Sequence, residues 1–507
     1  MATQAAPFRT CPVTGFKVHL PAQKLIIANA VAAVLVLTLG GILALLIGLT
    51  RWQAVHLLPA NLYYRFVTAH GMNMLVFWMV FFEVAGLYFG GAVILNARLV
   101  KPAVGWLAFA LMAGGAILAD IMVFLGKADV MFTAYVPLKA HPLFYLGIIL
   151  FAVGALVAVG LFFVTIVTAK IEGRHKGSLP LVTYGLVAAA IIATFTLLSG
   201  ALAFIPTFLW SIGIMAQPDA ETYRTLFWGF GHSAQQVNLA AMVAVWYALA
   251  TLTVGAKPLN EKLSRFAFLL YILFINLGSI HHLLVDPGLS SPYRVVNTSY
   301  VMYLAVVASM IHAFSIPSGV EIAQRAKGYK GLFGWLIHAP WKEPGFAAFA
   351  ISMVMFGFIG GVTGVLQGMM QLNMLAHNTL MIPGHFHATV VAGTTIAFMG
   401  LAYYLIPLMT QKQLVGKAWA RWQPYIYGSG LLLLISGMWL AGRMGVPRRS
   451  WDVLTFGGGA PFGTDVYSAA NGTLAVLGIG AVIAVIGGAI FVGIMVSTLL
   501  FGKKQQA

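Results

Sequence analysis

The chain has 507 residues, of which 60% are hydrophobic and only 8% are charged, whereas about 25% of the residues of an average soluble domain are charged. This composition excludes a soluble globular protein. The net charge of +17 is not concentrated in a basic soluble domain, so it indicates contact with anionic membrane lipid and argues against a nucleic-acid partner.

Apolar stretches of 20 or more residues recur along the chain, and each is long enough to cross about 30 Å of hydrocarbon. The sequence therefore predicts an all-α integral membrane protein with twelve transmembrane helices. We expect one membrane domain over 24–501, between tails at 1–23 and 502–507. The predicted spans are 24–50, 64–94, 104–125, 141–170, 181–212, 222–253, 263–283, 295–322, 344–371, 379–411, 421–443 and 468–501.

An even number of spans places both termini on one side of the membrane. Of the 29 Lys and Arg residues, 20 lie in segments on the side of the termini and nine on the opposite side. Cytoplasmic segments carry the excess of positive charge, so we expect both termini to be cytoplasmic in a prokaryotic inner membrane. The polar start of the chain, with Arg9 and Lys17, does not resemble a cleavable signal peptide.

Histidines at membrane depth give the strongest functional signal, because ionisable residues are costly there. The predicted topology places six of the 13 histidines in the outer part of the membrane, although they come from four separate spans. Unrelated structural histidines would not be expected to share one depth, so we interpret the six as metal ligands. They are His70, His232, His281, His282, His385 and His387.

Three of these histidines can form one site. His281 and His282 are adjacent at the end of a predicted helix, and they can reach one metal if that helix end is irregular. Asp286-Pro287-Gly288 just beyond favours such an end. His232 from another span can complete a three-histidine site, and imidazole suits iron, copper and zinc.

The other three histidines are divided by helical geometry. His385 and His387 are spaced i, i+2, so on a helix they point about 200° apart and can serve two metals but not one. One of them can pair with His70 on a six-coordinate iron porphyrin. The other, acting alone, gives a five-coordinate iron whose open face can lie opposite the three-histidine metal.

Several short motifs surround these histidines. They are Thr68-Ala69-His70-Gly71, Trp228-Gly229-Phe230-Gly231-His232, His281-His282-Leu283-Leu284-Val285-Asp286-Pro287-Gly288, His377-Asn378-Thr379, Pro383-Gly384-His385-Phe386-His387 and Val446-Pro447-Arg448-Arg449. With these motifs the chain resembles subunit I of the haem–copper oxidoreductase superfamily over roughly residues 20–500, and most nearly its B family, the ba3-type oxidases.

The resemblance implies cofactors and ligands. His70 and His387 would hold a low-spin haem of b or a type, and His385 would hold a high-spin haem of b or a type. A second active-site metal, either non-haem iron or copper, would be held by His232, His281 and His282.

The resemblance also implies roles around the haems. Arg448 and Arg449 would pair with haem propionates through charge-assisted hydrogen bonds, and Phe386 would lie on the electron path between the haems. His377 and Asn373 would lie near the propionates, although relatives often carry Asp at the second position.

The chain departs from oxygen reductases at one catalytic position. Those enzymes place Tyr four residues after the first metal-ligand His and join the two covalently, whereas this chain has Gln236 there. One helical turn puts His232 and Gln236 on the same face, so we expect the amide to face the metal site. Nitric oxide reductases of the superfamily commonly carry Glu at this position, and Gln236 offers a metal ligand or a hydrogen bond; Gln235 is the neighbouring alternative.

The resemblance places a polar proton path in spans 6 and 8. The matching residues are Tyr247, Ser309, His312 and Ser315. Val243 stands where relatives have Tyr, so the path is partly interrupted, and His312 is either a packed structural histidine or a proton relay.

Other polar and aromatic residues near the expected haems remain open. Glu83 is either a proton-handling carboxyl or a neutral acid hydrogen-bonded to a neighbour. Tyr135 and Trp228 are more often packing residues than chemical groups.

The leading hypothesis is a respiratory nitric oxide reductase of denitrification, which reduces NO to N2O. The alternative is a ba3-like cytochrome c oxidase that reduces O2 to water, with or without proton pumping. Electrons would come from cytochrome c or a small copper protein. Cys11 is the single cysteine, so a small subunit II would have to carry the electron-accepting dinuclear copper or haem c. A twelve-helix transporter is a third hypothesis, which the histidines at one depth argue against.

Overall fold

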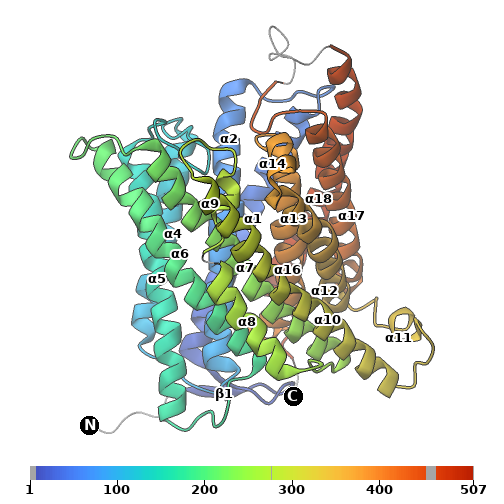
Figure 1. Ribbon diagram of the computed structural model, residues 1–507. Coiled ribbons are helices and arrows are strands. Elements are labelled where there is room, and N and C mark those ends of the chain that lie inside the picture. Colours follow the sequence, from blue (N-terminus) through green and yellow to red (C-terminus); the bar gives the residue numbers. More distant parts are fainter. Residues whose placement is uncertain (1–6, 276, 453–463, 506–507) are drawn as a thin grey trace.

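The computed structural model describes residues 7–275, 277–452 and 464–505, and it is a bundle of long, roughly parallel helices (Figure 1). Within these residues, eleven helices are long and apolar enough to cross a membrane. Six of them are continuous α-helices: α1 (Leu20–Arg51), α4 (Pro102–Phe124), α5 (Pro142–Ile171), α6 (Leu181–Ser211), α7 (Ala220–Val254) and α17 (Lys417–Arg443). A seventh, α18 (Thr464–Phe501), contributes the span Ala469–Phe501.

The remaining four spans are α-helices interrupted by π-helical segments, which are often found at functional sites. The first joins α2 (Ala60–Met72), η1 (Asn73–Phe77), α3 (Trp78–Tyr88) and η2 (Phe89–Val93). The second joins α9 (Ser291–Val295), η4 (Val296–Met302) and α10 (Tyr303–Ala326). The third joins α12 (Pro344–Val354), η5 (Met355–Gly361) and α13 (Val362–Gly368), and the fourth joins α15 (Met381–Phe386), η6 (His387–Thr395) and α16 (Ile396–Thr410). Short helices α11 (Gly334–Ile337) and α14 (Met370–Ala376) lie in connections.

The predicted span 263–283 differs from the others. It begins as α8 (Glu261–Ile275), a helix of 15 residues, and its last part is the 3-10 turn η3 (Ile280–Leu283). A regular helix therefore does not continue into the histidine pair. The irregular end agrees with what the sequence suggested. Asn297 stabilises the turn, because its Oδ1 atom accepts a hydrogen bond of 2.9 Å from the backbone N–H of Ile280.

Small residues let neighbouring helices approach closely. A Cβ atom added to Gly115 on α4 would lie 2.5 Å from the carbonyl oxygen of Gly147 on α5. Membrane helices use such contacts because lipid gives them little hydrophobic reason to associate. Helices α4 and α5 therefore pack backbone against backbone at this point.

The segment expected to be a plain N-terminal tail contains a small hairpin. Strand β1 (Phe8–Thr10) pairs antiparallel with β2 (Lys17–His19). Arg9 donates a hydrogen bond of 2.6 Å to the carbonyl oxygen of Leu408 near the end of α16. An isolated bridge between Lys412 and Lys504 brings the other end of the described chain to the same place, so both ends meet at one end of the bundle.

Candidate metal centre

The three-histidine group predicted from the sequence is assembled in the structure. His232 comes from α7, and His281 and His282 come from η3. One ligand nitrogen of each lies within 4.8 Å of those of the other two, and Nδ1 of His232 is 3.2 Å from Nε2 of His282. Successive side chains of a straight α-helix diverge by about 100°. The chain is irregular on both sides of the short turn η3, and there the two adjacent histidines approach one point.

Neighbouring groups fix the orientation of this group. Nδ1 of His281 lies 2.7 Å from the carbonyl oxygen of Gly278, so the ring donates from Nδ1 and leaves Nε2 for a metal. The indole of Trp228 stacks on His282, with ring centroids 3.9 Å apart and 6° between the planes. Trp228 in turn donates a hydrogen bond of 2.6 Å to the hydroxyl of Tyr135. These two aromatic residues pack as expected, and their packing positions His282.

His70 and His387 form the second site. Their rings are nearly parallel, with 13° between the planes and centroids 6.4 Å apart. Nδ1 of His70 lies 3.0 Å from the carbonyl oxygen of Gly40, and Nδ1 of His387 lies 2.7 Å from that of Pro383. Both rings therefore keep Nε2 free, and one metal bonded to each ring at about 2 Å fits this separation.

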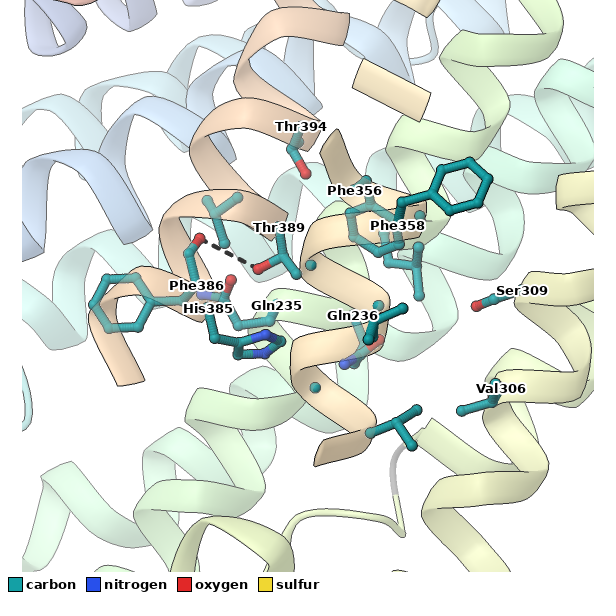
Figure 2. Close-up of a pocket in the computed structure, with 18 of the residues that line it drawn as sticks. Gln235, Gln236, Val306, Ser309, Phe356, Phe358, His385, Phe386, Thr389 and Thr394 are labelled. Atoms are coloured by element: carbon teal, nitrogen blue, oxygen red, sulfur yellow. Dashed lines mark hydrogen bonds between the residues drawn. The ribbon is translucent and has the colours of Figure 1, made fainter. Parts of the chain in front are cut away.

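His385 faces away from this pair and lines a large cavity (Figure 2). Its Nδ1 atom lies 3.0 Å from Oγ1 of Thr363 on α13. Helix α13 passes close to the His385 ring: a Cβ atom added at Gly364 would lie 2.9 Å from the ring. The structure thus directs His385 and His387 to different neighbours, as their spacing predicted.

The cavity has a volume of about 990 Å³, at the upper end of the range for ligand sites. It is lined by His385 on one side and by the three-histidine group on another. Both glutamines also line it (Figure 2). Gln236 is one of the lining residues, and Gln235, the neighbouring alternative, has a buried Oε1 atom without a hydrogen-bond partner in the described chain.

Arginines crowd one wall of the centre. Arg448 donates hydrogen bonds of 2.9 and 3.2 Å to Oδ1 of Asn378, and the Arg449 guanidinium lies 6.0 Å from the centroid of the Tyr135 ring. Arg51, at the end of α1, holds this loop through the carbonyl oxygens of Pro447 and Ser450. The sequence gave no motif for Arg51, because its partners are backbone atoms about 400 positions away.

The positive groups of this wall act on one another, and Asp286 offsets part of their charge. Burial, and then the neighbouring Arg449, lower the pKa of Arg448 to about 9. Burial, and then Arg448, lower the pKa of His377 to about 4, so this histidine is neutral at pH 7. The two neighbouring arginines favour an anionic ligand, and the propionates of a haem are ligands of that kind.

Asp286 and Asn373 have mainly structural partners. Asp286 accepts a hydrogen bond of 2.8 Å from Arg224 of α7, which ties the loop after η3 to that helix. Asn373 donates to the carbonyl oxygen of Gln367 at 2.7 Å and to that of His281 at 3.4 Å.

The predicted proton-path residues form two short hydrogen-bonded groups with residues that the sequence did not single out. The Tyr247 hydroxyl lies 3.0 Å from Nδ1 of His312 and donates to Ser264 at 2.8 Å. Ser264 lies 3.1 Å from the hydroxyl of Ser315.

Tyr271 and Ser309 form the second group. Tyr271 lies 2.9 Å from the hydroxyl of Ser309, and the Tyr271 and His312 rings are 5.5 Å apart. The two additional residues, Ser264 and Tyr271, lie on α8, whereas the sequence analysis followed only spans 6 and 8.

Comparison with known proteins agrees with this geometry. Residues 24–496 match the family described as cytochrome c and quinol oxidase polypeptide I. The chain is 31% identical to cytochrome c oxidase subunit 1 of Thermus thermophilus over 77% of its own length and 69% of that protein. It is 24% identical to quinol oxidase subunit 1 of Bacillus subtilis over 86% of its length and 68% of that protein.

A solved structure is similar over nearly the whole fold. A haem–copper terminal oxidase dimer studied by cryo-EM matches with a TM-score of 0.88 and 25% sequence identity, over 94% of this chain and 84% of that one. Fold and site together define a multi-pass membrane oxidoreductase of respiratory electron transport. The chain belongs to the haem–copper oxidase subunit I family.

Members of this family normally bind haems and a second metal, and the residues of this chain fit such groups. Four of the six histidines have Nδ1 within hydrogen-bond distance of an oxygen atom: His70, His281, His385 and His387. Metal-ligating histidines usually have such a partner, which fixes the ring and makes the free nitrogen more basic.

Proposed function

We propose that this protein is the catalytic subunit of a nitric oxide reductase. In this reaction two NO molecules take up two electrons and two protons and give N2O and water. The observation that supports the proposal is the pair of glutamines in the catalytic cavity, at the position where the resemblance to oxygen reductases calls for a redox-active tyrosine.

The proposal assigns each histidine a role. His70 and His387 hold a low-spin haem that stores an electron, and His385 holds a high-spin haem. His232, His281 and His282 hold the second metal, with Gln236 as an additional oxygen ligand or hydrogen-bond donor. Haem and metal together supply the binding and reduction of NO when they are present, and an oxygen ligand favours iron over copper at the second site.

The side chains of this cavity have their own tasks. The amide of Gln236 can orient an N–O group by donating a hydrogen bond, but it cannot supply an electron. Arg448 and Arg449 hold the acidic edge of a haem. Phe386 follows His385 and precedes His387 in the chain, so it links the ligands of the two haems.

Electrons reach the low-spin haem from a partner in this proposal. A small subunit II with a dinuclear copper site or a haem c accepts them from cytochrome c or a small copper protein. The termini are cytoplasmic, and the histidine sites lie in the outer part of the inner membrane. This arrangement follows the positive-inside rule.

Protons reach the cavity along the chain of hydroxyl groups and His312. Tyr247 connects Ser264 with His312, and Tyr271 with Ser309 continues toward the cavity, because both of these last residues line it. Replacing Tyr247 by Phe keeps the ring and removes the hydroxyl. We expect at least about tenfold slower turnover, since positioned proton donors contribute roughly 10²–10⁴-fold; unchanged turnover would exclude this path.

A second candidate function is O2 reduction, and one observation favours it. Among the described residues that line the catalytic cavity, Tyr271 is the only tyrosine. It is fully buried and lies 2.9 Å from the hydroxyl of Ser309. A phenol in the cavity could supply the electron and proton that O–O cleavage requires, although it comes from α8 and not from the helix that carries His232.

Turnover of the purified complex distinguishes the two functions. With a reduced donor, we expect N2O formation from NO that greatly exceeds O2 consumption. High O2 consumption with negligible N2O would overturn the proposal. Tyr271→Phe adds a second criterion, because it removes O2 reduction if Tyr271 is the missing phenol and affects NO reduction only through proton delivery.

A further inference from the structure

A second cavity lies on the other side of α7. Its volume is about 160 Å³, and residues of α3, α5, α6 and α7 line it. Along α7, His232, Gln235 and Gln236 line the catalytic cavity. Ala234 and Asn238 instead line the second one. The helix therefore separates two cavities with its two faces.

Two buried polar side chains, each with an unpartnered polar atom, face this largely apolar cavity. Glu83 on α3 is 8% exposed and Asn238 on α7 is 3% exposed. Oε1 of Glu83 and Nδ2 of Asn238 are buried and have no hydrogen-bond partner in the described chain. Leaving a buried polar group without a hydrogen bond is costly, so a cavity shared by two of them points to an occupant that bonds to both.

Water fits the space and the chemistry. One water needs roughly 10–15 Å³ of such volume and two to four polar partners, and the cavity is several times larger. Thr196 of α6 adds a third polar group, because its hydroxyl donates to the carbonyl oxygen of Ile192 at 2.8 Å and can still accept a hydrogen bond. A cavity of similar size lined only by apolar groups would stay dry.

The wall between the two cavities is thin at one residue. Leu75 of η1 lines the second cavity and also the catalytic cavity. It follows His70 by five residues, on the helix that also carries Glu83. A change in the Leu75 side chain would therefore bring water beside Glu83 into contact with the catalytic cavity.

We propose that this cavity is a water-binding site in which Glu83 holds a proton for the catalytic cavity. The neutral carboxyl donates to a cluster of water molecules, and Asn238 and Thr196 hold the cluster at its other edges. In the transfer step, the O–H bond of the carboxyl breaks, one forms on the adjacent water, and a proton passes along the cluster beyond Leu75. The cluster then gains a proton from bulk water and returns it to the carboxylate, so the carboxyl and the cluster regain their starting state and no electron moves.

This site is distinct from the chain that contains Tyr247 and His312, because none of the residues of that chain lines the second cavity. The inference rests on the proposed function only in that the reductase reaction consumes protons, which both NO and O2 reduction do. The inference can therefore be tested by a measurement that does not depend on the rate of NO or O2 reduction.

Infrared difference spectroscopy of the reduced and oxidised complex tests the site. We expect a C=O stretching band of a protonated carboxyl that shifts in D2O and is absent from Glu83→Gln. Asn238→Leu keeps the carboxyl but removes one edge of the water cluster, so the band should move to higher frequency. Asp120→Asn is the matched control, because that carboxyl is bonded to Asn73 at 2.8 Å and lies outside the cavity; this variant should keep the band.

The possible outcomes separate the proposal from its rivals. A spectrum that is the same in Glu83→Gln and the unaltered protein would overturn it. A band that does not respond to D2O or to Asn238→Leu would show that the cavity is dry or holds an apolar molecule, and would also overturn it. If Glu83→Gln does not assemble, the D2O and Asn238→Leu measurements still decide. In the expected case, Leu75→Phe keeps the band and slows proton uptake by about tenfold or more.

Discussion

The histidine sites and the cavity beside Glu83 differ in how their polar groups are held. In the histidine sites, protein oxygens orient the rings: Nδ1 of His70 and of His387 each lies within 3.0 Å of a backbone carbonyl oxygen. In the second cavity, Oε1 of Glu83 and Nδ2 of Asn238 have no such partner. Metal ligation requires a fixed direction for each ligand, whereas a proton carrier exchanges partners with water. The difference thus separates places that bind metals from places that move protons.

The largest effect is expected at the His70–His387 pair. His387→Ala should abolish the low-spin haem signal and lower haem content from two per chain to one, because a single remaining ligand does not hold a six-coordinate iron. The measurement is the optical spectrum with pyridine haemochrome quantification. His338→Ala, on the exposed connection after α11, is the control. Retention of both haems in His387→Ala would contradict the assignment.

The two glutamines give the next effect and test which one matters. Gln236→Leu should lower NO turnover by roughly 10²-fold, about what removal of one donor in a preorganised site costs. Gln235→Leu, of matched volume on the same helix, should have a smaller effect. Steady-state N2O production measures both. A larger loss in Gln235→Leu would transfer the role to Gln235, whose Oε1 atom has no partner in the described chain.

Thr363→Val tests whether the groups behind the histidines contribute. It keeps the shape of the side chain and removes the hydroxyl 3.0 Å from Nδ1 of His385. Loss of such a partner typically costs 10–100-fold in metal affinity or activity, and we expect about tenfold in turnover together with a shift in the high-spin haem spectrum. Thr253→Val, which loses only a bond to the Leu249 carbonyl oxygen, should do neither. Equal behaviour of the two variants would contradict this role.

The smallest effect is expected in the N-terminal hairpin, at a histidine that a backbone N–H group holds. His19 accepts a hydrogen bond of 3.2 Å from the backbone N–H of Leu99, and burial, and then Arg98, lower its pKa to about 4. The unfolded chain gains a proton at the ordinary pKa of about 6.5. The contribution of His19 to stability is therefore complete above about pH 6.5 and falls until the pH reaches about 4.

Thermal unfolding in detergent as a function of pH measures this contribution. His19→Gln retains an acceptor but does not titrate, so its stability should depend less on pH between about 6.5 and 4 than that of the unaltered protein. The control variant His175→Gln, on the connection after α5, should show the same dependence of stability on pH as the unaltered protein. A His19→Gln profile identical to that of the unaltered protein would contradict the assignment.

Much of the fold and site followed from local sequence patterns. Runs of apolar residues predicted the spans, and the i, i+2 spacing of His385 and His387 predicted that they face different neighbours. The groups behind the histidines could not be predicted, because the carbonyl oxygen of Gly40 has no sequence signature and reaches His70 from another helix.

Other differences have equally physical reasons. The hairpin of β1 and β2 consists of two three-residue strands, too short to show a periodic pattern. The turn η3, which carries His281 and His282, is held by the side chain of Asn297 from the next span. Ser264 and Tyr271 join the polar chain only because α8 packs against α10.

The central claim is tested most directly by the metal content of the purified complex, corrected for the metals of its partner subunit. For this chain the account predicts three irons and no copper: two in haems, and one held by His232, His281 and His282. Two irons with one copper in that site would contradict the claim and favour the reduction of O2.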